Sequence, residues 1–412
     1  MALVDIRVLS GERVNRLETG TVSLLIGSAD PLFPITNLYD GRPSRSFRTT
    51  SATTSIQILV DGNSVVNGSL DSWSGGAPSG WTVESGTVTQ TVVAGEFVNG
   101  SAAKFNPGLI SQNFTVRSGE KRTISSQLRG DGVAGIAMTL QNLTTGSQLQ
   151  NNGTWSSGGG SVMSRVPNTY AAASVNYTVE PFSTTQADTC TMRLVIAAAA
   201  LGYADDIYDY PAADFVSVHG HNLDASVLAR FYSATDSLFP IATLQATIAI
   251  VQPSFYALLA APVYARYFTF YLTYLVGANS VIPEIGELVI GQTYALTVPP
   301  EYGAEIGYMR DDVATDTGVG ELAVYARSAQ TRRTLGLKFH FETETRMRAA
   351  RDEVFRRSGG RLNPIVVIPD TTLPDVIFGR LDRTWKVTRT LTTYYDQNDL
   401  QISELPFPVP TN

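Results

Sequence analysis

The sequence predicts a mainly all-β protein with one helix, and three observations support this class. Short runs of β-branched and aromatic residues, such as TVTQTVV and QNFTVRS, recur between turn-forming residues, which is typical of β-sandwiches. Charged residues make up only 16% of the 412 positions, so Ser, Thr, Asn and Gly must supply much of the polar surface. Residues 344–360 alone predict a helix, because Met347, Ala350 and Val354 share one face and a Gly-Gly pair follows.

Composition changes twice along the chain and predicts three modules. Residues 63–209 hold 17 charged residues in 147 positions, whereas residues 305–412 hold 30 in 108. We expect 63–209 to be a domain inserted between 1–62 and 210–291, which together form a discontinuous second domain. Residues 292–412 form the third, a strand-rich assembly module that contains the helix and ends in a Pro-rich tail.

The predicted strands follow one another in the order of these modules. The discontinuous domain contains TTSIQILVDG before the insertion and DFVSVHGHNL, YARYFTFYLT and IGELVIG after it. The insertion contains GWTVES, TVTQTVV, QNFTVRS, KRTISSQL, AGIAMTLQN, VNYTVEPF and CTMRLVIAA. The last module contains GELAVYARSAQTRRTLGLKFHFET before the helix, and NPIVVIPD, DVIFGRLD and WKVTRTLTTYY after it. Each run is rich in residues that favour strands and is bounded by turn formers.

Charge and cysteine content exclude several classes of protein. The formal net charge of −7 gives no general attraction to phosphate backbones, so we expect no nucleic-acid binding. A single cysteine, Cys190, excludes an intrachain disulfide. The most apolar stretch, residues 255–278, is interrupted by Pro262 and Arg266, so we expect no membrane insertion. The first residues, MALVDIRVLSGERVNR, lack the pattern of a signal peptide.

The segments on either side of the insertion resemble one family. NLYDGRPSRSFRTT, a strand that ends in Asp61-Gly62, and then HNL, ARY and IGEL occur in the order of the discoidin, or galactose-binding-like, β-sandwich. Phe47 stands where that family usually has a Trp. The resemblance implies that residues 1–62 and 210–291 fold into one such sandwich.

The inserted segment resembles the jelly-roll β-sandwich of carbohydrate-binding modules. VNGSLDSWSGGAPSGWTVESG, residues 66–86, is similar to that family's opening, and YADDIYD, residues 203–209, is similar to its closing strand. The resemblance implies a structural calcium ion, the one cofactor expected here, held by one acidic residue of each segment. By position these residues are Asp71 and Asp206, and carboxylate oxygens are ligands that calcium prefers. Asp71 stands where the family usually has a Glu.

The combination of these modules resembles bacteriophage virion proteins of the tail tip or baseplate. It implies a structural protein that is made in the bacterial host cytoplasm and assembles in the virion as a homo-oligomeric ring or hub with other tail proteins. The insertion would contact host surface glycans. Of the 30 basic residues 26 are Arg, which suits planar pairing at interfaces, although acidic residues on the same helix are alternative partners. The candidate assembly residues are Arg332, Arg333, Arg348, Arg356 and Arg357.

Two of the three histidines, His219 and His221, lie two positions apart in DFVSVHGHNL. A metal site there would need a third and usually a fourth ligand, and the remaining histidine, His340, belongs to another module. On a strand the two side chains point to the same side. We therefore expect the pair to satisfy backbone groups of the adjoining loop rather than to bind a metal.

Trp73 and Trp155 are the candidate glycan-binding residues, because an indole face fits the C–H surface of a sugar ring. The alternative is core packing, which we expect for Trp81. Adjacent carboxylates such as Asp205 and Asp206 face opposite sides of a strand and cannot flank one glycosidic bond, and no nucleophile-elbow, Walker or zinc-protease motif occurs. We therefore expect no catalytic activity. The alternatives are a secreted or cell-surface glycan-binding adhesin and a glycoside hydrolase.

Overall fold

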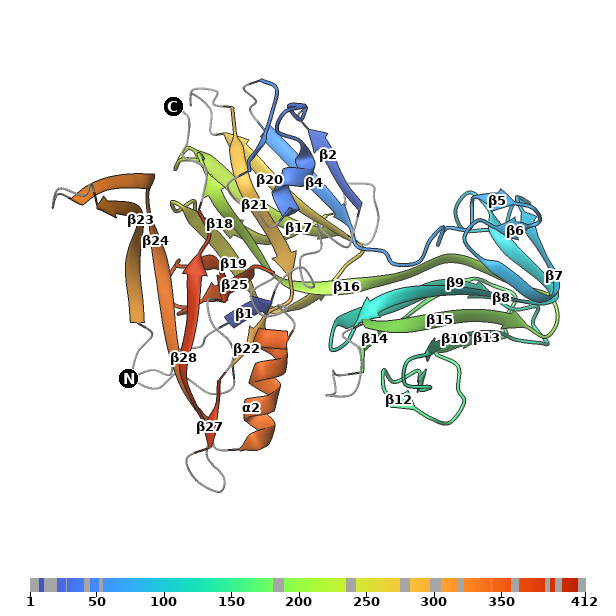
Figure 1. Cartoon of the computed structure of the whole chain (residues 1–412). Helices are drawn as coiled ribbons and strands as arrows, with labels where there is room; N and C mark the ends of the chain where they lie inside the picture. Colours follow the sequence, from blue (N-terminus) through green and yellow to red (C-terminus); the bar gives the residue numbers. More distant parts are fainter. Residues whose placement is uncertain are drawn as a thin grey trace.

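The computed structural model describes residues 7–10, 21–26, 28–40, 45–51, 55–180, 189–234, 242–274, 282–296, 305–316, 322–341, 343–356, 363–381, 386–389 and 395–406. Most of these residues are in antiparallel β-strands, and one α-helix lies among them (Figure 1). The mainly all-β class is therefore confirmed. None of the described helices is long and apolar enough to cross a membrane.

Residues 63–209, called the arm below, form a two-layered sandwich that reaches away from the rest of the chain (Figure 1). One layer contains β7 (Thr82–Thr91), β8 (Ala102–Arg117), β15 (Thr189–Ala198), β10 (Ile136–Asn142) and the short β11 (Gln148–Leu149), β12 (Trp155–Ser156) and β13 (Met163–Arg165). The other contains β14 (Ala171–Thr178), β9 (Lys121–Arg129), β16 (Gly202–His221) and the first residues of β8. A small hairpin of β5 (Trp73–Ser74) and β6 (Ala77–Pro78) lies at the start of the arm.

Strands β7 and β8 pass from one layer to the other, and glycine makes that passage possible. Gly86 and Gly108 pair with each other between two register shifts. Gly86 has a φ of 72°, and a Cβ atom there would lie 2.1 Å from the carbonyl oxygen of Pro107. Only glycine fits such a close approach of two backbones, so β7 and β8 can bend here from one layer into the other.

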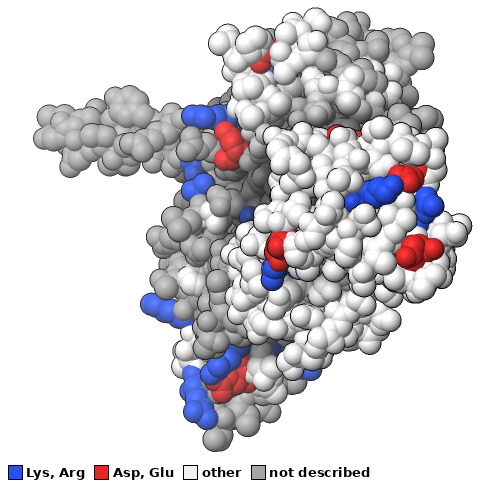
Figure 2. Space-filling model, turned by 90° about the vertical axis from the view of Figure 1, so that its right-hand side faces the viewer, with Lys and Arg blue, Asp and Glu red and all other residues white. Residues whose placement is uncertain are grey.

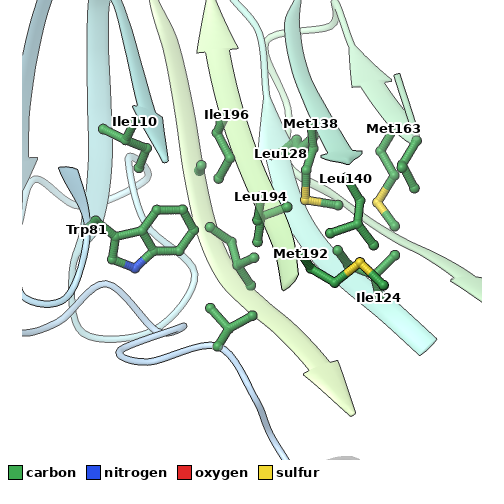
Figure 3. Close-up of a cluster of buried hydrophobic side chains, with 14 of the residues drawn as sticks. Trp81, Ile110, Ile124, Leu128, Met138, Leu140, Met163, Met192, Leu194 and Ile196 are labelled. Carbon is green, nitrogen blue, oxygen red and sulfur yellow. The ribbon is translucent and has the colours of Figure 1, made fainter. Parts of the chain in front are cut away.

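The core of the arm lies between the two layers (Figure 3). Ile110, Leu194 and Ile196 reach it from one layer, and Ile124 and Leu128 from the other, all with 2% or less of their surface exposed. These residues alternate with outward-facing ones, as the period of a half-buried strand requires.

Trp81 points into this core from the start of β7 (Figure 3). Its ring is 6% exposed, and its indole nitrogen donates a hydrogen bond of 3.1 Å to the carbonyl of Val66. The polar tip of the ring is thus satisfied by the backbone while the ring fills the core. The prediction of core packing for Trp81 is confirmed.

One continuous strand joins the arm to the neighbouring sandwich. Residues 202–211 of β16 pair with β8 and β9, and residues 212–221 pair with β19 (Ser254–Tyr264) and β21 (Glu284–Gly291). The predicted module boundary between 209 and 210 lies inside this strand. Sequence pattern does not mark the crossing, because a strand alternates in the same way on both sides of it.

The second sandwich packs one sheet against the continuation of β16. Its first sheet has the order β18 (Thr243–Ile248), β17 (Val227–Ala234), β20 (Tyr267–Tyr274), β4 (Ser55–Asp61) and β2 (Thr21–Ile26). Its second contains β19, β16, β21 and β3 (Phe47–Arg48), next to a 3₁₀-helix at Ile35–Tyr39. The core between them is aromatic and almost wholly buried: Phe47, Phe231, Phe255, Phe268 and Phe270.

The third group of elements is a sheet with the order β22 (Tyr294–Ala295), β1 (Arg7–Ser10), β25 (Ile365–Ile368), β26 (Ile377–Leu381), β28 (Tyr395–Glu404), β24 (Leu322–Phe341) and β23 (Glu305–Asp316); β27 (Thr388–Arg389) also pairs with β28. Strand β1 therefore differs from the expectation that residues 1–62 belong to the discoidin-like sandwich. The buried strand β25 needs a hydrogen-bonding neighbour on each side, and β1 supplies one of them. Long-range pairing of this kind leaves no local sequence pattern.

The predicted helix is present as α2 (Glu344–Ala350), which continues as a π-helical segment, Arg351–Arg356. Thr343 caps it by accepting a hydrogen bond of 3.3 Å from the backbone N–H of Arg346, as expected of an N-cap threonine. Ala350 and Val354 are buried, and Met347 packs against the same cluster. The predicted apolar face is confirmed.

This third sheet is packed against the second sandwich. Phe215 and Val289 of the sandwich and Val366 and Phe378 of the sheet form one buried cluster. The hydroxyl of Tyr256 also donates a hydrogen bond of 2.7 Å to the carbonyl of Leu373. The second sandwich and the third sheet thus form one body, from which the arm projects.

Candidate functional site

A pocket of about 390 Å³ lies on the outer face of the arm, where it meets the second sandwich. Its volume is at the lower end of the range of about 300–1,000 Å³ for small-molecule sites. The described residues that line it come from both parts of the chain: residues 125–127 of β9, residues 172–174 of β14, Asp206, Tyr208 and Tyr210 of β16, Asn99, and Arg266 of the second sandwich.

The floor of the pocket is formed by two neighbouring strands, and its side chains are uncharged and either small or amides. Along β9, Ser125 and Gln127 alternate with core-facing residues and point outward. On β14, Ala172, Ala173 and Ser174 are exposed at the rim. Since none of these side chains is large, a ligand can lie against the backbone of the sheet.

A bulge in β16 turns the polar and aromatic side chains into the pocket. The register with β9 shifts between Asp205 and Tyr208, and Asp206 has a φ of 48°. Ile207 therefore enters the core, while Asp206 and Tyr208 face the pocket. The hydroxyl of Tyr208 donates a hydrogen bond of 2.7 Å to Asp206 Oδ1. Burial, followed by that carboxylate, raises the pKa of Tyr208, so it remains a neutral donor.

Arg266 closes the pocket on the side of the second sandwich. Its guanidinium lies 4.0 Å from the ring centre of Tyr208 and 4.6 Å from that of Tyr267. Asp61 holds it through three contacts, of which Nη2 to Oδ2 is the shortest at 3.0 Å. Ring contact and ion pairing together fix the orientation of the guanidinium.

A buried carboxylate supports the loop that carries Asn99. Asp205 Oδ2 accepts hydrogen bonds from the backbone N–H groups of Val98 and Asn99, at 2.7 and 3.1 Å. Burial raises the pKa of Asp205 to about 7. The side-chain amide of Asn99 in turn donates to Asp206 Oδ2 at 2.9 Å. Asp205 therefore positions a loop without lining the pocket itself.

The two residues expected to hold calcium approach this loop from opposite ends. Asp71 Oδ1 accepts a hydrogen bond of 2.7 Å from the N–H of Ser101, while Asp206 accepts from Asn99 and Tyr208. Calcium takes six to eight oxygen ligands. Within the part of the chain that the structure describes, no three His, Cys, Asp or Glu side chains are grouped to hold a metal ion. The binding of a calcium ion by Asp71 and Asp206 stays a prediction.

The two tryptophans predicted to bind glycans are half-buried and pack against the core of the arm. The indole nitrogen of Trp73 donates to the carbonyl of Leu70 at 2.6 Å, and that of Trp155 to the carbonyl of Thr178 at 2.8 Å. Trp155 also contacts Tyr177 edge-to-face, with ring centres 5.8 Å apart. Neither residue lines the described pocket, and their role in glycan binding stays a prediction.

The candidate assembly arginines lie in different surroundings. Arg333 binds Glu404 and Asp375 within the chain and donates a hydrogen bond of 2.9 Å to the carbonyl of Val376. Arg348 pairs with Glu344 one turn away on α2, as the alternative of intrahelical pairing expects.

Of the other three arginines, the structure describes the side chain of Arg332 alone. Arg332 is half-buried on β24. The side chain of Arg356 and the whole of Arg357 lie outside the described residues, as does the end of the Pro-rich tail. The assembly role of the arginine set stays a prediction.

The two neighbouring histidines have structural partners. His221 contacts the carbonyl of Val251 at 3.1 Å and accepts from the N–H of Leu223 at 3.2 Å, which confirms that it satisfies loop backbone. His219 instead bonds two hydroxyl groups, and its ring lies 4.9 Å from that of Phe378 in the third sheet. The prediction that the two side chains point to the same side of the strand is wrong, because Gly220 between them has a φ of 62° and breaks the alternation.

The pocket residues other than Asp206 were not among the predicted site residues. Tyr208 and Tyr210 left a detectable signal, since they alternate with buried Ile207 and Asp209. In the sequence, Arg266 stands out only as a charged residue that interrupts the apolar stretch 255–278. Its proximity to Tyr208 depends on how the two sandwiches meet, which no local pattern encodes.

No family model and no curated protein matches the chain. Among solved structures, the chain is similar to the CBM22-1 xylan-binding domain from Paenibacillus barcinonensis Xyn10C, with 14% identity and a TM-score of 0.26 over 36% of this chain and 95% of that one. It is similar to TmCBM61 in complex with β-1,4-galactotriose, with 13% identity and a TM-score of 0.21 over 36% and 98%. The enzymatically active domain of bacteriophage CBA120 tailspike protein 4 matches at 14% identity and a TM-score of 0.25, over 36% of this chain and 21% of that one. At these TM-scores the β-sandwich architecture rests on the strand pairing described above, not on the likenesses.

Proposed function

We propose that the chain is a non-catalytic, glycan-binding structural protein and that the pocket on the arm is its sugar site. The observation that carries this proposal is the composition of the pocket, which combines tyrosine rings with amide, hydroxyl and carboxylate groups over an uncharged floor. A sugar ring has apolar C–H faces and a rim of hydroxyls, so aromatic surface and placed polar groups together suit it.

The same pocket is poorly suited to glycoside hydrolysis. Hydrolysis by most such enzymes needs two carboxyl groups that flank the scissile bond. Among the described residues that line the pocket, Asp206 is the one carboxylate. Asp61 is bound to Arg266 and does not line the pocket. Asp205 accepts hydrogen bonds from the loop backbone. Binding without turnover is therefore the function that these groups favour.

The sequence resemblance extends this proposal to a place in a bacteriophage tail. In that setting the body would assemble with other tail proteins, and the arm, which projects from it (Figure 1), would present its pocket to host surface glycans. A secreted or cell-surface adhesin is the alternative, with the same pocket and no assembly. Electron microscopy of the full-length protein separates the two, because closed rings support the tail component and monomers favour the adhesin.

The sugar site is tested by screening the full-length protein on a glycan array. We expect saturable binding to a restricted set of glycans, weakened about tenfold by Tyr208→Ala and retained on Tyr208→Phe. The matched control is Tyr308→Ala in the third sheet, where the side chain is 73% exposed. Binding that survives Tyr208→Ala unchanged would place the sugar site elsewhere, and turnover of any bound glycan would overturn the non-catalytic assignment.

A further inference from the structure

The pocket has a defined direction across the strands of the arm. From β14 the path crosses β9 and reaches β16, because β9 pairs with β14 on one side and β16 on the other. Residues 172–174 line the first end, Gln127 the middle and Tyr208 the last part. A glycan that lies across the strands would follow this path.

The path ends at β16. On its far edge, Asp209 accepts a hydrogen bond of 2.7 Å from the N–H of Ser64 and donates one of 3.0 Å to the side chain of Asn63. The segment that enters the arm thus covers this edge. Above it stands Arg266, stacked on Tyr208 and bound by Asp61.

The wall formed by Arg266 is braced from behind. The backbone carbonyl of Arg266 accepts a hydrogen bond of 2.9 Å from Gly62. A Cβ atom at Gly62 would lie 3.2 Å from the ring of Pro211, so the chain is tightly packed at this point. Because backbone, ion pair and ring contact all hold it, the wall does not swing aside without breaking several interactions at once.

The opposite end of the pocket is open. Within the described residues, β14 pairs with β9 alone, and its residues 172–174 are exposed and small. No large side chain of this stretch stands in the way of a chain that leaves the pocket over β14. As the described residues form it, the pocket is therefore closed at one end and open at the other.

We propose that this pocket binds the terminal units of a neutral oligosaccharide, with the chain end against the Arg266 wall and the remainder leaving over β14. The inference rests on the proposed sugar site and adds the class of ligand to it. Arg266 acts as a specificity-determining residue, because it stops a continuing chain from crossing β16. A polysaccharide bound in mid-chain would need the path to be open at both ends.

The charges around the pocket favour a neutral sugar. The positive charge of Arg266 is already paired with Asp61, so it offers little to an anionic ligand. Asp206 adds a negative charge that disfavours uronic or sialic acids. Seen from the side of the arm, most of the described surface carries no charge (Figure 2). At several places on it, basic and acidic side chains lie beside each other.

The experiment uses the full-length protein and a glycan array that presents the same linkages as chain ends and as internal segments. We expect binding to neutral terminal structures only. For the best linkage, calorimetry with oligosaccharides of increasing length should show an affinity that levels off after two or three units, and soluble polysaccharide should bind in proportion to its chain ends rather than its mass. Equal binding to internal segments overturns the inference while leaving the sugar site intact. No glycan binding at all overturns both.

A paired substitution tests the wall itself. Arg266→Ala combined with Asp61→Asn removes the guanidinium without leaving an unpaired charge. We expect affinity for the short terminal ligand to fall about tenfold, or about 1.4 kcal/mol, and mid-chain polysaccharide binding to appear. The matched control is Arg193→Ala with Glu84→Gln, an ion pair on the other layer of the arm. If the wall variant keeps its melting temperature and its preference for chain ends, Arg266 does not determine specificity.

Discussion

A buried ion network beneath the pocket should be essential for the stability of the arm. Arg122 on β9 is 3% exposed and donates a hydrogen bond of 3.0 Å to Asp209 Oδ2, while Asp209 is fully buried on β16 between the two pocket tyrosines. Arg122 also contacts Glu120 and Ser64, and Tyr177 donates to Asp209 Oδ1 at 2.8 Å. The network thus joins β9, β16 and the segment that enters the arm.

The Arg122→Met substitution fills similar space but leaves the carboxylates without their cation. Removing one partner of a buried pair costs about 3–5 kcal/mol, so we expect a loss of this size. Burial already raises the pKa of Asp209, and Arg122 opposes that rise. Without Arg122 the pKa rises further and Asp209 takes up a proton more readily, so the loss should be larger at pH 8 than at pH 5.

Urea unfolding followed by tryptophan fluorescence measures this loss, because three of the four tryptophans, Trp73, Trp81 and Trp155, lie in the arm. The control is Arg193→Met, whose partner is Glu84. These side chains are 34% and 31% exposed, so the control should lose only about 0–1 kcal/mol. An Arg122→Met variant no less stable than the control, at either pH, would refute the reasoning.

Three further predictions concern the pocket, pH and metal. Tyr208→Ala should weaken glycan binding about tenfold, since an aromatic contact contributes about 0.5–1.5 kcal/mol beyond its buried area; calorimetry with the best ligand measures this. Burial lowers the pKa of His219 to about 3 and that of His221 to about 4, so the unfolded chain binds protons first as pH falls from about 6.5. The melting temperature should therefore drop between pH 6.5 and 4, and more steeply than in a variant with both histidines changed to Gln; Asp205, with its raised pKa, acts in the opposite direction. If Asp71 and Asp206 hold a calcium ion, EDTA should lower the melting temperature and added calcium should restore it, whereas an unchanged melting temperature would contradict the calcium site.

The helix and the core of the arm could be predicted because they depend on local pattern. The apolar positions of α2 repeat at helical spacing, and the two layers of the arm alternate apolar and polar residues. Trp81 was expected in the core because tryptophan often fills sandwich cores and because it matches the structural Trp of the opening Gly-Trp in the family that the insertion resembles. These features follow from the periodicity of helices and strands and from the burial of apolar surface.

The candidate site could be predicted only in part. Asp206 was predicted as a site residue, but as a calcium ligand, because its position matches the closing strand of the family that the insertion resembles. Tyr208 and Arg266 lie 58 positions apart in the sequence, and nothing in either neighbourhood indicates that they stack. The tryptophans were selected by residue type, but their indole N–H groups are bonded to nearby carbonyls, an arrangement visible only in three dimensions.

The sequence by itself determined that the chain forms sandwiches of short strands with one helix, because alternation, turn residues and composition act locally. The tertiary structure alone decided that β1 joins the third sheet, that β16 runs unbroken from the arm into the body, and that Arg266 closes a pocket on the arm. Each of these depends on pairing between residues far apart in the chain. Backbone hydrogen bonds are alike at every position, so the choice of distant partner is set by how whole sheets pack and not by the residues of any one strand.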